Sequence, residues 1–240
     1  MSEWAPKRFW TSADVKETET GFAVVLDGRP VRTPAKAVLE VPSRAIAEKI
    51  ASEFAAQDDR IDPGTMPFTK TANAAIDKVA LQLLEVADLL AEYGDSDLLC
   101  YRADAPEALV ERQNMVWDPL LEWAERELNA KLEPRVGVMH APQDPAAISE
   151  LRERVRAMNA FELAAFHDLV AISGSLVIGF AAKSGDHPID ELWSASRVDE
   201  DWQQEQWGED EEAVEMAKHK QAAFLHAFDF LRLLNGQSGA

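Results

Sequence analysis

The segment from residue 199 to residue 212 contains the densest group of side chains that could do chemistry in this chain. It reads DEDWQQEQWGEDEE, so it is rich in carboxylates and has no basic residue. Paired carboxylates can transfer protons or bind Mg²⁺, but a catalytic site also needs a nucleophile, an orienting partner or further ligands. Because the sequence supplies no such motif, we predict no catalytic residue, and an acidic metal-dependent hydrolase stays as an alternative.

The histidines and the cysteine form no recognisable motif either. His219 and His226 are seven residues apart. Because no third ligand lies at metal spacing, we interpret them as two separate side chains and not as a zinc site. Cys100, the sole cysteine, lies in an apolar run, which indicates a buried, inert thiol and a reducing compartment. We therefore expect no metal and no cofactor. The histidines are His140, His167, His187, His219 and His226.

Two tryptophans change the meaning of the acidic segment. A pure run of charge is usually a solvated surface, whereas indole rings are enriched where proteins bind one another. Trp202 could also turn inward behind Leu192 and Val198. We predict a partner-binding surface on which Glu205 and Glu212 flank Trp207 and face Lys or Arg of the partner. Its residues are Asp199, Glu200, Trp202, Gln203, Glu205, Trp207, Gly208, Asp210 and Glu212.

The charge of the chain limits the kind of partner. The formal net charge is −19 at pH 7, and the pI is about 4.6. Nucleic acids and anionic membrane surfaces both require a basic face, so we expect neither as a partner. Residues 161–182 are long enough to span a membrane, but Glu162 and Asp168 favour a buried helix and no membrane insertion. A basic patch on a protein partner fits the charge, although good solubility alone would also explain it.

The first 41 residues have the pattern of a small antiparallel sheet. An apolar run at 22–26 is followed by Asp27-Gly28, the preferred pair for a two-residue hairpin turn. Pro30 in the return strand cannot donate a ladder hydrogen bond, so we expect an edge strand. The predicted strands cover residues 8–16, 22–26, 29 onward and 37–41.

From residue 43 onward the apolar residues recur at helical spacing. Ser43 is the expected N-cap of the first helix, and Pro63, Gly64 and Pro67 mark a loop after it. Pro119 is expected to kink or split a later helix, with Asp118 capping the second piece. The predicted helices cover residues 43–55, 72–90, 106–128, 144–158, 161–182, 188–206 and a last one ending at 235.

This order of elements predicts the α+β class. We expect a small antiparallel β-rich N-terminal domain with one helix at residues 1–65, followed by a larger all-helical domain at residues 66–240. The N-terminus lacks the basic and apolar regions of a signal peptide. We therefore expect a bacterial cytoplasmic protein, with the mature form of a mitochondrial-matrix protein as the alternative.

Several motifs occur in an order that resembles a known family. They are LDGRPVRTP at 26–34, MPFT at 66–69, DLLCYR at 97–102, WDPLL at 117–121, GSLV at 174–177, DEDWQ at 199–203 and WGEDEEA at 207–213. Together they resemble the ATP synthase assembly chaperones that attend the alpha subunit of the soluble catalytic head. The resemblance spans almost the whole chain, and Phe54 departs from it where the family more often has Trp.

The resemblance implies a function without catalysis. Such factors bind the unassembled alpha subunit, shield the surface destined for the beta subunit and leave on assembly, without hydrolysing nucleotide. The resemblance also implies that an acidic residue of the stretch from 199 to 213 matters, with Glu200, Glu205, Asp210 and Glu212 as candidates. We expect a monomer when the protein is free. A permanent structural subunit of the ATP synthase is a further alternative.

Overall fold

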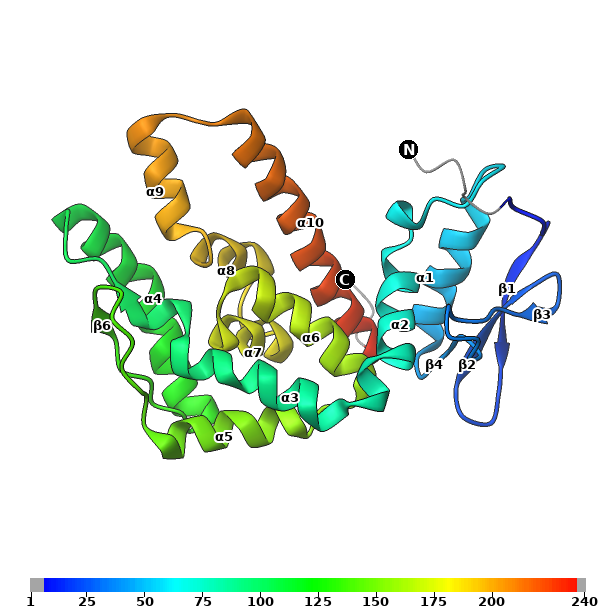
Figure 1. Cartoon of the computed structure of the whole chain (residues 1–240), viewed down its shortest axis with the longest axis horizontal. Helices are drawn as coiled ribbons and strands as arrows, with labels where there is room; N and C mark the ends of the chain where they lie inside the picture. The colour runs from blue at the N-terminus through cyan, green and yellow to red at the C-terminus, as the bar shows by residue number, and fades with distance from the viewer. Residues whose placement is uncertain (1–6, 237–240) are drawn as a thin grey trace. The chain divides into compact units, whose positions relative to one another are not determined.

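The computed structural model describes residues 7–236, and its elements form two compact units (Figure 1). Among the described residues, the first unit comprises residues 7–83, 159–165 and 229–236, and the second comprises residues 84–158 and 166–228. A small antiparallel sheet near the N-terminus is followed by helices, which confirms the predicted α+β class. The domain boundary that we placed between residues 65 and 66 stays a prediction.

The sheet of the first unit is built around one central strand. β2 (Phe22–Leu26) pairs antiparallel with β1 (Ala13–Glu17), β3 (Arg29–Pro30) and β4 (Glu40–Val41). Asp27 and Gly28 have positive φ angles of 48° and 78°, as the predicted hairpin turn requires. The first strand begins later than predicted because Trp10 turns into the core, where its indole N–H donates to the Phe54 carbonyl at 3.3 Å.

Helices α1 (Arg44–Ala55) and α2 (Pro67–Asp77) complete the first unit. Ser43 occupies the N-cap position of α1, but its hydroxyl makes no capping bond and donates instead to the Leu233 carbonyl at 2.6 Å. Phe230 stacks on Phe68 with ring centroids 5.9 Å apart. The final residues of α10 (Glu211–Leu234) therefore belong to the core of the N-terminal unit.

Three of the predicted helices are broken in the structure. The predicted helix at 72–90 ends at Lys78, whose φ and ψ of −125° and −63° are not helical. Likewise, Gly174 with a φ of 72° interrupts residues 161–182. The helix expected at 188–206 is interrupted at Arg197, whose φ of −115° and ψ of 6° are not helical. Periodicity does not reveal such breaks, because the apolar residues on either side keep helical spacing.

Pro119 does not split its helix, because α4 (Glu107–Leu128) continues through it. The N–H that proline lacks would have bonded to the carbonyl of Met115, which is 77 % exposed, so water can take that place. Asp118 consequently caps nothing, and its carboxylate accepts a hydrogen bond from Arg102 at 2.8 Å. Asp144, by contrast, caps the helix that was predicted to begin there, by accepting from the Ala146 N–H at 3.1 Å.

The second unit is helical apart from two short strands. Trp117 of α4 is fully buried, and its indole N–H donates to the Ala195 carbonyl at 2.7 Å, which joins α4 to α8. None of the described helices combines the length and hydropathy that crossing a membrane requires. The remaining elements are α3 (Leu83–Ala91), β5 (Tyr101–Arg102), β6 (Arg135–Val136), α5 (Pro145–Arg156), α6 (Ala160–Ser173), α7 (Leu176–Ser184), α8 (Ile189–Ala195) and α9 (Val198–Trp207).

Candidate partner-binding site

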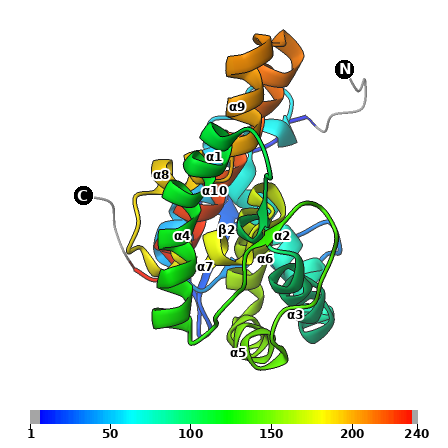
Figure 2. The same ribbon diagram turned by 90° about the vertical axis from the view of Figure 1, so that its left-hand side faces the viewer.

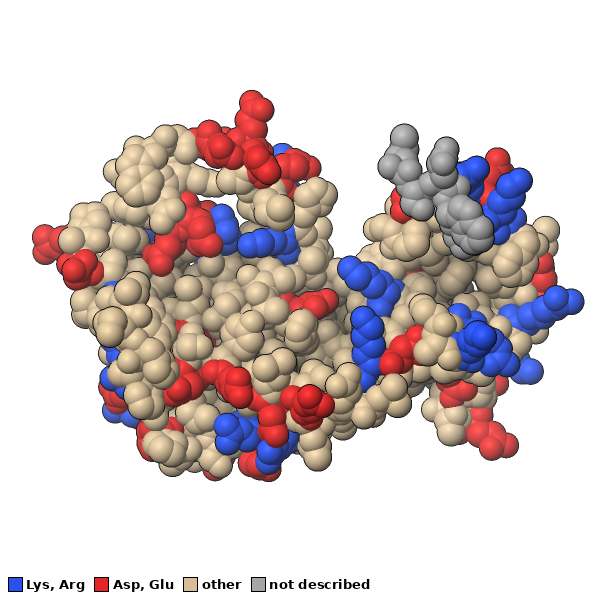
Figure 3. Space-filling view, viewed as in Figure 1, with Lys and Arg blue, Asp and Glu red and all other residues tan. Residues whose placement is uncertain are grey.

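The acidic segment of the sequence forms α9, the turn after it and the first turn of α10. Helix α9 packs against α4, and Figure 2 shows both on the side of the second unit that faces the viewer. Gly208 ends α9 with a φ of 90°, a conformation that residues with a Cβ rarely adopt. Asp210 then caps α10, since its Oδ1 accepts from the Ala213 N–H at 2.8 Å. Acidic side chains gather over this α9–α10 connection in Figure 3.

Several of the predicted carboxylates are bound within the chain. Glu205 is half exposed, but both of its oxygens accept hydrogen bonds from Arg112 of α4, each at 2.8 Å. This arginine lowers the pKa of the Glu205 carboxyl below its usual value. Glu200 pairs with Arg197 at 3.1 Å, and Asp199 accepts from Gln113 at 2.6 Å. These three carboxylates therefore stabilise α9 through contacts within the chain.

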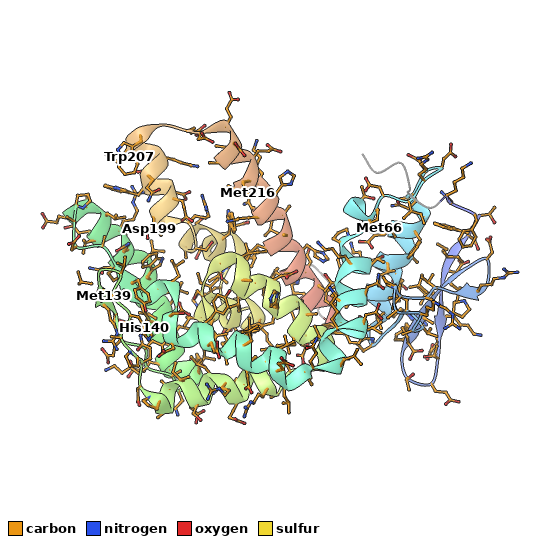
Figure 4. All side chains as sticks on the ribbon, in the orientation of Figure 1. Met66, Met139, His140, Asp199, Trp207 and Met216 are labelled. Carbon is orange, nitrogen blue, oxygen red and sulfur yellow. The ribbon has the colours of Figure 1, made fainter. Side chains whose placement is uncertain are left out.

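The two tryptophans have different surroundings. Trp202 is half buried, and the Arg112 guanidinium lies over its ring, 4.9 Å from the centroid. Trp207, at the end of α9, is 80 % exposed (Figure 4). The alternative that Trp202 turns inward is thus correct in part, whereas Trp207 faces solvent. Gln203, Gly208 and Glu212 are also exposed, and the binding role of all these residues stays a prediction.

A groove with a volume of about 650 Å³ runs beside α9. Trp202, Gln203 and Trp207 line one side, and Leu109 of α4 and Val138 are among the residues that line the remainder. A space of this size is in the range of ligand sites and is large enough to receive several side chains of a partner. We call it the Trp207 groove and define it by residues 101–106, Leu109, Gln113, 137–138, Asp199, Trp202, Gln203, Gln206 and Trp207.

An apolar loop tip adjoins this groove. Val136, Val138 and Met139 are 71 %, 90 % and 82 % exposed, so three large apolar side chains point into solvent within four residues. The next residue, His140, has its Nδ1 3.2 Å from the Tyr101 hydroxyl and its Nε2 3.3 Å from Asp95 Oδ2. The loop is thus fixed at its base while its tip remains uncovered.

Sequence reasoning missed this loop tip. Its signal was present as the apolar run Val-Gly-Val-Met at 136–139, which lies between Pro134 and Pro142 and follows neither helical nor strand periodicity. Sequence reasoning also missed Arg112, because its partner Glu205 is 93 residues away in the chain. No local pattern indicates such a pair.

A buried arginine positions the floor of the groove. The Arg102 side chain donates to the Leu99 carbonyl, to Asn114 and to Asp118, each at 2.8 Å. Its guanidinium also lies over the Trp117 ring, 5.2 Å from the centroid. These contacts hold the 97–102 motif against α4. They thereby position the start of residues 101–106, which line the groove.

The other polar residues of this motif are also structural. Asp97 is fully buried, and its carboxylate accepts from the N–H groups of Leu99 at 3.0 Å and Val177 at 3.1 Å. Burial outweighs these hydrogen bonds and raises the pKa of Asp97 to about 6. Cys100 is buried, as predicted, and burial raises the pKa of its thiol to about 12, which disfavours the nucleophilic thiolate. Within residues 7–236, no three His, Cys, Asp or Glu side chains are arranged to hold a metal ion.

Comparison with known proteins identifies the family. Residues 7–125 match the model of the ATP12 chaperone protein family. Atp12 from Paracoccus denitrificans, whose crystal structure is known, is 46 % identical in sequence. The match covers 95 % of this chain and 98 % of the Paracoccus chain, and the TM-score is 0.92. A protein of Agrobacterium tumefaciens is 40 % identical, with coverage of 95 % of this chain and 86 % of its own and a TM-score of 0.91.

A curated relative extends the similarity to eukaryotes. The mitochondrial protein atp12 of Schizosaccharomyces pombe is 26 % identical over 227 residues, which cover 88 % of this chain and 76 % of the relative. Both solved structures match 95 % of this chain. At 46 % and 40 % identity, proteins share their fold and their family. The chain therefore belongs to the ATP12 chaperone family, the ATP synthase assembly chaperones that its sequence motifs resemble.

Proposed function

We propose that this protein binds the unassembled alpha subunit of the ATP synthase catalytic head, shields its beta-facing surface until assembly, and catalyses no reaction. The observation that carries the proposal is the exposed apolar set around α9, formed by Trp207 together with Val138 and Met139. Aromatic and methionine side chains are typical of the centres of protein interfaces, and large uncovered apolar patches on a soluble chain mark binding surfaces.

The physical requirement on such a chaperone matches this surface. A lone ring subunit exposes the faces that its neighbours will later cover, and such faces drive aggregation. A binder suppresses aggregation by mass action, in proportion to RT ln(1 + [L]/Kd). Because it must also leave, an apolar centre with a charged rim serves better than a sealed apolar contact.

The carboxylates of α9 also favour binding over hydrolysis. Glu205 pairs with Arg112, Glu200 pairs with Arg197, and Asp210 caps α10. Each of these carboxylates makes a different contact within the chain, and they do not converge on one point where a substrate or Mg²⁺ would bind. We expect the free protein to be a monomer of the bacterial cytoplasm or, in the alternative, of the mitochondrial matrix.

Co-expression with isolated subunits tests the proposal. The alpha subunit should co-purify with this chain, the beta subunit alone should not, and addition of beta to the alpha complex should release the chaperone. Capture of beta alone, or of neither subunit, would contradict the proposal. Stoichiometric presence of the chain in purified ATP synthase would support a permanent subunit instead, and heat of binding with Mg²⁺, Mn²⁺ or Zn²⁺ in calorimetry would support the hydrolase.

A further inference from the structure

We propose that the Trp207 groove and the adjoining loop tip at 136–139 receive a segment of the partner in which large apolar side chains stand next to Lys or Arg. The inference rests on the proposed function, because it takes the alpha subunit as the partner. It adds the place of contact and the chemistry of the segment that is recognised.

The first argument is the arrangement of the apolar groups. Val138 and Trp207 come from segments far apart in the sequence, yet both line the same groove. Figure 4 shows Met139 and Trp207 near the two ends of this side of the unit, with Asp199 between them. Anchors at both ends and a hollow between them suit an elongated segment that places one side chain in the groove and rests others on the two anchors.

The second argument is that the loop tip is held in place before binding. Arg135 donates to the Pro142 carbonyl at 2.6 Å, and the Gln143 N–H donates to Asp95 at 2.7 Å. His140 is held between Tyr101 and the same aspartate. A surface loop with so many fixed bonds at its base loses little conformational entropy when its exposed tip is covered, and this favours affinity.

The third argument is charge. Asp104 and Asp199 line the groove. The cation in its wall, Arg102, is paired with Asp118, and nearby Arg112 is paired with Glu205. The groove therefore presents net negative charge to a partner, in a chain whose net charge is −19. Lys or Arg beside the apolar residues of the bound segment would complement the carboxylates, and an arginine could also stack on the exposed Trp207 ring.

The test uses the full chain, isolated alpha subunit and an array of overlapping 15-residue peptides that cover the alpha subunit sequence. Trp207→Ala and the double variant Val138→Ser/Met139→Ser should each lower affinity for the alpha subunit about tenfold or more. Leu89→Ser is the matched control, because Leu89 of α3 is 62 % exposed and does not line the groove. Its affinity should stay within about twofold of wild type, as for exposed residues outside an interface.

A labelled variant reports on the site directly. Cys100 is buried, so a bimane dye attached to Met139→Cys should modify only the loop tip. Its emission should shift to shorter wavelength when alpha subunit, or a peptide with apolar and basic residues, covers the tip. Asp104→Asn should weaken binding of such peptides, and added salt should weaken it further.

The outcomes separate the two proposals. Undiminished capture of the alpha subunit by Trp207→Ala and by the loop double variant, with no dye shift, would overturn this inference and leave the proposed function standing. Peptide binding in the groove without capture of the alpha subunit would overturn the proposed function, and with it the identity of the partner, but would leave the chemistry assigned to the groove standing. Equal binding of apolar peptides with acidic in place of basic residues would overturn the charge assignment. Unchanged circular dichroism and Tm of each variant are the condition for every comparison.

Discussion

Replacement of Arg102 by methionine tests the proposed role of the buried motif beneath the groove. Methionine has nearly the length of arginine and keeps an apolar body against Trp117, but it removes the guanidinium. The three hydrogen bonds to Leu99, Asn114 and Asp118 are then lost together. The guanidinium contact with the Trp117 ring is lost with them, whereas the volume of the side chain changes little.

The expected destabilisation follows from which partners can still reach water. Asp118 is half exposed, so its carboxylate can be rehydrated, and it should contribute only about 0.5–1 kcal/mol. Leu99 is fully buried, and its stranded carbonyl should cost about 1–3 kcal/mol. With the bond to Asn114, the Arg102→Met variant should lose about 2–4 kcal/mol of the free energy of unfolding.

Arg112→Met is a closely matched control. Arg112 also donates to a carboxylate and also lies over an indole ring, yet its side chain is partly exposed, whereas that of Arg102 is buried. Exposed pairs of this kind contribute about 0–1 kcal/mol. In urea unfolding followed by circular dichroism, Arg102→Met should lower the midpoint by about 1 M, with an m-value of about 2–3 kcal/mol/M. Equal midpoints for the two variants would refute the view that burial makes Arg102 the structural anchor of the motif.

Three further predictions concern other residues. The pKa of Asp97 is raised from 3.8 to about 6, so the stability contributed by its protonated form is complete below about pH 4 and is lost as the pH rises through 6. In urea titrations at several pH values, Asp97→Asn should lack this slope, and an unchanged slope would assign it to another group. Gly179→Ala should lower the free energy of unfolding by about 1–3 kcal/mol, because the new Cβ would lie 2.6 Å from Val170 Cγ2; an unchanged midpoint would contradict this close packing. Glu205→Lys should change tryptophan fluorescence because it repels the arginine held over Trp202, whereas Glu212→Lys, on the exposed first turn of α10, should not; identical spectra would rule out that coupling.

Local signals in the sequence were sufficient for much of the fold. Asp27-Gly28 specified the hairpin turn, and Asp144 specified the start of α5, because both effects act within a few residues. The breaks at Lys78 and Gly174 escaped prediction because the apolar residues on both sides of each break keep helical spacing.

The candidate site was less predictable than the fold. The exposure of Trp207 followed from its acidic neighbours, whereas the pairing of Glu205 with Arg112 depends on α4 and α9 meeting in space. The loop tip at 136–139 was overlooked because an apolar run in a loop has no periodicity to mark it. Its exposure becomes apparent only in the structure, where neighbouring segments leave it uncovered.

The final turn of α10 has a consequence for how the protein is made. Phe230 stacks on Phe68, and the Leu233 carbonyl accepts the bond from Ser43, so the N-terminal unit closes only with residues from the far end of the chain. During synthesis, the sheet and its two helices must wait until Leu233, 190 residues after Ser43, has left the ribosome before that side of their core is covered. Deletion of the last helical turn should accordingly weaken the unit that contains the sheet.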